Sequence, residues 1–141
     1  MTRRISPHEA RELIEAQGYV YVDVRSMAEF EGGHPEGAYN VPFMDVGPSG
    51  MVPNAAFVST MARVFPKDAK LVVGCLSGVR SVRACAALEA AGYTDLADQR
   101  AGWGGAKDTF GRLIETGWSG AGLPSAAGPD PVRGYEALKK A

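Results

Sequence analysis

Short apolar runs alternate with stretches of helical spacing along this chain. The runs at residues 19–24 and 70–74 are rich in branched or aromatic side chains and predict two buried strands, and a shorter piece at 95–97 predicts a third. The remaining pattern predicts helices at 7–17, 27–30, 54–64 and 80–91. Strands that alternate with helices in this way indicate an α/β domain with a central, mostly parallel sheet and helices on both faces.

The first predicted helix has clear signals at both ends. Ser6 before Pro7 and Glu9 is typical of an N-cap with its capping-box partner, and Gly18 indicates the helix end. Asn54 is the expected cap of the third helix. The apolar face of the first helix is expected to consist of Ala10, Leu13, Ile14 and Ala16.

Two segments interrupt the alternation. Residues 31–42 are rich in Gly and Pro and predict a loop. Residues 102–122 predict a loop and a short helix, because Phe110, Leu113 and Ile114 have helical spacing.

The length of 141 residues, with 45% hydrophobic residues, fits one domain with a full core. We place this domain at residues 1–124. Residues 125–141 then form a C-terminal tail, which is either mobile or docked on the body through Tyr135 and Leu138.

Charge and cysteine content argue against several classes of function. The net charge of −1 and the absence of a Lys/Arg-rich run argue against nucleic acid or a membrane as a partner. The two cysteines lie outside any C-x-x-C pair and away from histidine at ligand spacing, which argues against a disulfide framework and a structural metal. No apolar run approaches the roughly 18 residues that span a bilayer, and no secretory h-region is found, so a cytoplasmic location is expected.

Cys75 carries the strongest indication of chemistry. It lies between the strand at 70–74 and the helix at 80–91, in a turn of small residues that closes at Arg80. Such a turn points backbone N–H groups inward, and the helix dipole favours an anion at the same point. The simpler alternative is a buried apolar cysteine, but the flanking residues favour a thiolate nucleophile.

Three ordered signatures resemble the rhodanese-like family of sulfurtransferases between residues 5 and 124. The first comprises Asp23-Val24-Arg25, Glu29-Phe30 and residues 33–42, GHPEGAYNVP; the second is the loop from Cys75 to Arg80 with Ser81 behind it; the third comprises Ala101-Gly102-Trp103, Trp118 and Gly122-Leu123-Pro124. The resemblance implies a rhodanese-like α/β fold. It also implies that Cys75 takes a sulfane sulfur from a donor such as thiosulfate, holds it as a persulfide and passes it to cyanide or a thiol, without a metal or organic cofactor.

Loop length separates the branches of this family. Four residues lie between Cys75 and Arg80, which matches the sulfur-transferring branch, whereas the branch that acts on phosphate or arsenate has one residue more. The resemblance therefore favours a thiosulfate sulfurtransferase over a phosphatase or arsenate reductase. A sulfur-relay or regulatory module that binds a protein partner and turns over little alone is a further alternative.

The candidate active loop contains the substrate-binding residues Leu76, Ser77, Gly78, Val79 and Arg80. Two roles fit Arg80, which either steers an anionic donor or braces the loop. Ser77 either donates its hydroxyl to the persulfide or is an ordinary turn residue, and Gly78 lets the loop curl.

The resemblance adds supporting residues outside this loop, namely Asp23, Arg25, Ser81 and Trp103. Structural support is the expected role of Asp23, because a carboxylate beside a thiolate would disfavour its charge. Arg25 either adds positive potential or pairs with Glu29. Trp103 either walls the pocket or anchors the core.

Other residues invite chemistry but have simpler interpretations. His34 falls in a structural loop of the family pattern, and Cys85 among alanines is expected to be a core thiol rather than a resolving cysteine. Residues 104–117 lengthen the usual run to the closing tryptophan. Basic side chains in or near this stretch either shape the pocket rim or form a solvated surface: Arg100, Lys107 and Arg112.

Overall fold

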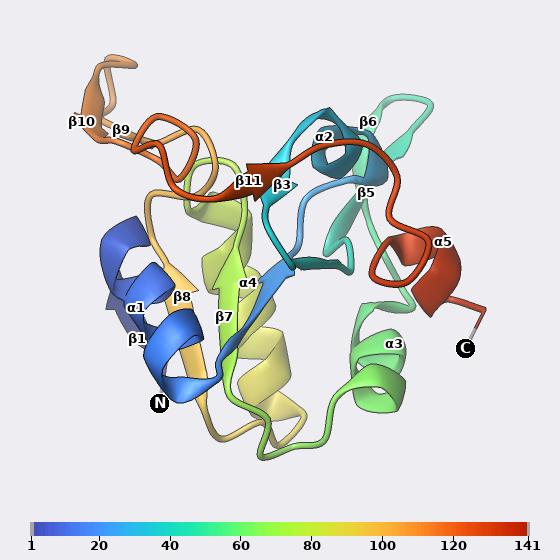
Figure 1. Ribbon diagram of the computed structural model, residues 1–141. Helices are drawn as coiled ribbons and strands as arrows, with labels where there is room; N and C mark the ends of the chain where they lie inside the picture. The colour runs from blue at the N-terminus through green and yellow to red at the C-terminus, as the bar shows by residue number, and fades with distance from the viewer. Residues whose placement is uncertain (1, 141) are drawn as a thin grey trace.

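A computed structural model describes residues 2–140. Within them, the central sheet has five strands, each parallel to its neighbours (Figure 1). Their spatial order is β1 (Arg3–Ile5), β8 (Leu96–Gln99), β7 (Leu71–Gly74), β2 (Val20–Asp23) and β4 (Tyr39–Asn40). The three predicted strands correspond to β2, β7 and β8, and the prediction of an α/β fold with a parallel sheet is confirmed.

Helices cover both faces of the sheet, as predicted (Figure 1). On one face lie α1 (Pro7–Gln17) and α2 (Met27–Gly32), which contribute Ala10 and Phe30 to a core cluster around Trp118. The opposite face carries α3 (Phe57–Val64), α4 (Val79–Ala90) and α5 (Tyr135–Leu138).

Alternation along the central strands divides the core between these two faces. On β7, Leu71 and Val73 join the cluster under α3 and α4, whereas Val72 joins the cluster under α1. Cys75 continues the alternation and lies on the α4 side, at the carboxyl end of the sheet. This is the edge at which open α/β sheets carry their sites.

The first helix begins and ends as its sequence predicts. Ser6 Oγ accepts a hydrogen bond from the Glu9 N–H at 3.1 Å, and the Glu9 carboxylate accepts one from the Ser6 N–H at 2.8 Å. Gly18 ends the helix with φ of 72°. The predicted apolar face of α1 wrongly included Ala16, which is exposed. The helix predicted at 54–64 begins at Phe57, and Asn54 donates its amide to the Pro42 carbonyl.

Short strands in the glycine-rich regions were not predicted. The expected loop at 31–42 contains β3 (His34–Pro35) and β4, and a hairpin follows, formed by β5 (Met44–Gly47) and β6 (Gly50–Pro53). The strand β3 pairs with β11 (Ser125–Ala126), far away in sequence. Elements of two residues leave no hydrophobic period, so only tertiary pairing defines them.

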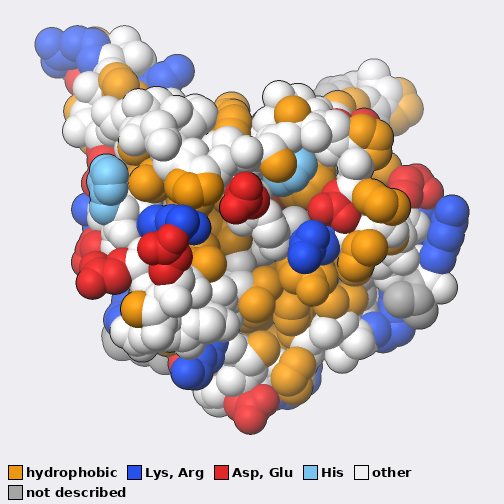
Figure 2. Space-filling model, viewed as in Figure 1, with side chains coloured by type: hydrophobic (Ala, Val, Ile, Leu, Met, Phe, Trp, Pro, Cys, Tyr) orange, Lys and Arg blue, Asp and Glu red, His pale blue; other side chains and the backbone are white. Residues whose placement is uncertain are grey.

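The short helix predicted within residues 102–122 is wrong. The segment forms a hairpin of β9 (Ala106–Lys107) and β10 (Leu113–Glu115), which projects from the body at the upper left of Figure 1 and Figure 2. The Asp108 carboxylate accepts hydrogen bonds from the Phe110 and Arg112 N–H groups and fixes the turn. The helical spacing of Phe110, Leu113 and Ile114 did not indicate a helix, because these side chains are exposed and no core packs against them.

Residues 125–140 lie against the body. Beyond β11, the Asn40 N–H donates to the Arg133 carbonyl at 2.9 Å, and Tyr135 and Leu138 are buried in the α3 and α4 cluster. The two side chains proposed to dock therefore do so. The division into a domain at 1–124 and a tail at 125–141 stays a prediction.

Candidate active site

Cys75 lies beneath a curled loop at the start of α4. Its Sγ accepts hydrogen bonds from the Gly78 N–H at 3.2 Å and the Ser81 N–H at 3.3 Å, and Ser81 Oγ lies 3.5 Å away. The residue is 2% exposed. Two backbone donors and the first turn of a helix thus converge on one sulfur, an arrangement that stabilises negative charge there.

Glycine at position 78 allows this curl. Gly78 has φ of 90° and caps α4, and a Cβ at this position would come within 2.1 Å of the Arg100 carbonyl oxygen. Any side chain would therefore meet both an unfavourable backbone conformation and a backbone clash.

A second loop braces the first from behind. The Trp103 and Gly104 N–H groups donate to the Cys75 and Leu76 carbonyls, each at 2.8 Å. Gly102, with φ of 65°, permits this approach, because a Cβ there would lie 2.5 Å from the Cys75 carbonyl oxygen. Ala101, which stands where the family often has glycine, is buried and donates its N–H to the Gln99 side chain at 2.9 Å.

The buried side chain of Gln99 holds this second loop, and sequence reasoning missed it. Its Oε1 accepts from the Ala101 and Gly102 N–H groups, and its Nε2 donates to the Gly102 carbonyl, all at 2.9 Å. The sequence does contain one indication of this role, because Gln99 is a polar residue at the carboxyl end of a buried strand.

Arg80 closes the active loop by pairing with α2. Its two terminal nitrogens donate to the two Glu29 carboxylate oxygens at 2.7 and 3.0 Å. Burial raises the pKa of Glu29, but hydrogen bonds from Arg80 and the Ser26 N–H outweigh it and lower that pKa to about 2. Of the two roles that fit Arg80, this geometry favours bracing the loop over steering a donor.

Asp23 and Arg25 form a buried ion pair at the same edge of the sheet. Arg25 Nη2 donates to Asp23 Oδ2 at 2.7 Å and to the Gly33 carbonyl at 2.5 Å. Burial raises the pKa of Asp23, and the Arg25 guanidinium opposes that rise. The guanidinium lies 5.3 Å from the centre of the Trp103 ring. The ion pair is therefore connected to Cys75 only indirectly, through Trp103. Glu29, which was considered as a partner of Arg25, pairs with Arg80 instead.

His34 and Cys85 lie away from these contacts. His34 Nδ1 is 2.6 Å from the Phe30 carbonyl oxygen, and its ring stacks on Phe30. Cys85 is a free thiol within α4, and burial raises its pKa well above the usual range.

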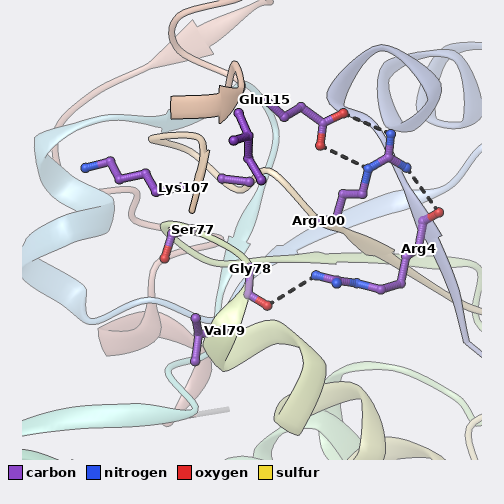
Figure 3. Close-up of a pocket in the computed structure, with 9 residues that line it drawn as sticks. Arg4, Ser77, Gly78, Val79, Arg100, Lys107 and Glu115 are labelled. Atoms are coloured by element: carbon purple, nitrogen blue, oxygen red, sulfur yellow. Dashed lines mark hydrogen bonds and ion pairs between the residues drawn. The ribbon is translucent and has the colours of Figure 1, made fainter. Parts of the chain in front are cut away.

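A hollow of about 510 Å³ lies between the active loop and the projecting hairpin (Figure 3). The residues that line it are Arg4, Ser77, Gly78, Val79, Arg100, Ala106, Lys107, Ile114 and Glu115. Two of the three basic side chains considered for the rim, Arg100 and Lys107, are therefore placed there. The third, Arg112, pairs with Asp108 at the hairpin turn and does not line the hollow.

Comparison with known proteins defines the class. The family model of the rhodanese-like domain matches residues 6–108, so the chain belongs to the rhodanese-like domain family. It is 38% identical over 123 residues to thiosulfate sulfurtransferase 16, chloroplastic, of Arabidopsis thaliana, and covers 92% of that protein. The alignment includes 87% of this chain. The predicted family resemblance is thereby confirmed.

Two further matches set the limits of the likeness. The chain is 44% identical over 94 residues to the senescence-associated protein DIN1 of Raphanus sativus, an alignment of 67% of this chain and only 51% of that protein. The crystal structure of Rv0390 from M. tuberculosis superimposes with a TM-score of 0.75 at 28% identity, covering 91% of this chain and 98% of that one. No helix within residues 2–140 has the length and hydrophobicity to cross a bilayer.

Proposed function

We propose that this protein is a sulfurtransferase that moves a sulfane sulfur from thiosulfate to cyanide or a thiol through a persulfide on Cys75. The observation that carries the proposal is the convergence of the Gly78 and Ser81 N–H groups on the Cys75 sulfur. The same donors favour an anionic persulfide. The four-residue spacing from Cys75 to Arg80 and the relative named as a thiosulfate sulfurtransferase support this choice.

The proposed reaction has two displacements. The Cys75 thiolate attacks the outer sulfur of thiosulfate, the sulfur–sulfur bond of the donor breaks, and sulfite leaves with the electron pair. Cyanide then attacks the outer sulfur of the persulfide, that bond breaks, and thiocyanate leaves while the Cys75 thiolate is restored. Neither step needs an oxidant, a reductant or a cofactor.

Intact mass after thiosulfate treatment tests the proposal. We expect the wild type to gain the mass of one sulfur atom and to lose it on addition of cyanide, with thiocyanate formed. Cys75→Ala should gain nothing. Cys85→Ala is the matched control, because it removes the other buried thiol, and should load like the wild type.

Absence of an adduct on a folded wild type, or an adduct on folded Cys75→Ala, would overturn this assignment. Circular dichroism of each variant separates loss of chemistry from loss of fold. A reducing compartment such as the cytosol suits the two free thiols, and we propose it as the location.

A sulfur-relay or regulatory module that uses this fold chiefly to dock a protein partner, with little turnover alone, is the second candidate function. The observation that favours it is the exposure of apolar side chains on the hairpin, where Phe110 is 82% and Ile114 67% exposed. A biological effect that survives in Cys75→Ala would favour docking over sulfur transfer, and its loss in a folded variant would favour transfer.

A further inference from the structure

The hollow between the active loop and the hairpin is larger than a small inorganic anion needs. Its volume of about 510 Å³ falls within the range of sites for organic ligands, roughly 300–1,000 Å³. Ser77, Gly78 and Val79 form its floor, and the Gly78 N–H is one of the donors to the Cys75 sulfur. A molecule in this hollow therefore lies beside the loop that holds the nucleophile.

Two of the three cations that line the hollow are neutralised. Arg4 Nε donates to the Asp98 carboxylate at 2.9 Å, and its Nη2 donates to the Gly78 carbonyl. Arg100 donates to both oxygens of Glu115, each time at 2.9 Å. Figure 3 shows the Arg100 and Glu115 pair at one side of the hollow.

Lys107 is different. Among residues 2–140, it is the lining cation with no carboxylate within 4 Å. Lys107 lies on β9 above Ser77, and its ammonium points away from the Arg100 and Glu115 pair (Figure 3). It also lines a smaller hollow of about 230 Å³, together with Leu76 and Ser77. The space beside the active loop thus has one uncompensated positive charge.

Apolar side chains complete the walls. Val79, at the start of α4, and Ile114, on β10 of the hairpin, are each 67% exposed, and both line the hollow. A ligand that suits these walls has an aliphatic part and an anionic end.

Given the proposed sulfur transfer, on which this step rests, we infer that the hollow binds an organic thiol acceptor that carries a carboxylate, and that Lys107 selects that carboxylate. The acceptor thiolate attacks the outer sulfur of the persulfide, takes it as its own persulfide and leaves the Cys75 thiolate. The hairpin at 104–117 then determines acceptor specificity, while the loop around Cys75 performs the chemistry.

Acceptor kinetics at about 0.15 M ionic strength test this inference. Protein loaded with thiosulfate is discharged with glutathione, which has two carboxylates, or with its diethyl ester, which is similar in size and lacks both charges. The readout is the ratio of kcat/KM for the acid to that for the ester. We expect Lys107→Glu to lower this ratio about fivefold, the size of effect that an exposed charge contact gives when its sign is reversed.

Arg112→Glu is the matched control. It reverses an exposed charge on the same hairpin, and because Arg112 does not line the hollow and salt screens exposed charges, we expect the ratio to stay within about twofold. Equal ratios in wild type and Lys107→Glu, with sulfur still loaded on Cys75, would overturn the inference alone. Failure of the wild type to load sulfur would overturn the proposed function.

Discussion

Cys75 and Cys85 lie ten residues apart, and each is 2% exposed. Cys75 ends the alternation of a strand and faces two backbone N–H groups, whereas Cys85 lies mid-helix in a cluster of apolar side chains. Burial raises the pKa of the Cys85 thiol, and the nearby Asp98 and Glu89 carboxylates add to that rise. The two sites are equally shielded from water, and Cys75 is distinguished by the two peptide N–H groups that point at its sulfur.

The largest expected effect of this difference is on alkylation. With limiting iodoacetamide at pH 7, we expect Cys75 to be carboxamidomethylated at least about 100-fold faster than Cys85, because only the thiolate attacks. Peptide mass mapping over time measures both rates in one sample. Labelling in denaturant is the control, and the two rates should then converge. Equal slow rates in the folded protein would contradict the comparison.

Gly78→Ala should disrupt the loop that directs backbone N–H groups at Cys75. A Cβ at a φ of 90° would come 2.1 Å from the Arg100 carbonyl oxygen, so we expect a loss of about 2–4 kcal/mol in the free energy of unfolding and loss of sulfur loading. Urea denaturation measures the first and intact mass the second.

Gly18→Ala is the matched control for that variant. Gly18 also has a positive φ, 72°, but a Cβ there would meet nothing within 4 Å. We expect a smaller cost of about 1 kcal/mol and normal loading. Equal costs for the two variants would mean that the clash with Arg100 is relieved and does not shape the active loop.

The sequence predicts the Cys75 side of this comparison well, because its determinants are local. The apolar run at 70–74, Gly78 and the following helix all lie between residues 70 and 91. Partners that come from far away were not predictable: Arg80 pairs with Glu29 across 51 positions, and β11 pairs with β3. The hairpin at 106–115 was wrongly predicted as a helix, because its exposed apolar residues have helical spacing by chance and pack against no core.

The Arg80 and Glu29 pair gives a pH-dependent prediction. The folded pKa of Glu29 is about 2 against an ordinary value of 4.5, so its contribution to stability is complete above pH 4.5 and is lost as pH falls toward 2. We expect Glu29→Gln to cost about 1–2 kcal/mol at pH 7, and clearly less at pH 3. Urea denaturation of wild type and variant at both values measures the difference.

Glu9→Gln provides the comparison for that experiment. Glu9 occupies the same capping-box position in α1 but is solvent-exposed and lacks a bidentate arginine. Its substitution should have the smaller effect at pH 7 and should leave sulfur loading unchanged. A larger effect at position 9 than at position 29 would show that capping, and not the arginine, accounts for the stability.

The smallest expected effect distinguishes backbone from side-chain contacts at Cys75. The Ser81 N–H donates to the sulfur at 3.3 Å, whereas the sulfur donates to Ser81 Oγ at 3.5 Å, and Ser81→Ala removes only this second contact. A long contact of this kind contributes about 0.5 kcal/mol, so the rate of sulfur loading should fall about twofold. Ser59→Ala is the control for the change in helix propensity from Ser to Ala, because Ser59 is an exposed residue of α3. A fall of tenfold or more at position 81 alone would move the stabilisation of the sulfur from the peptide dipoles to the hydroxyl, and Cys75 would then differ from Cys85 by a single side chain.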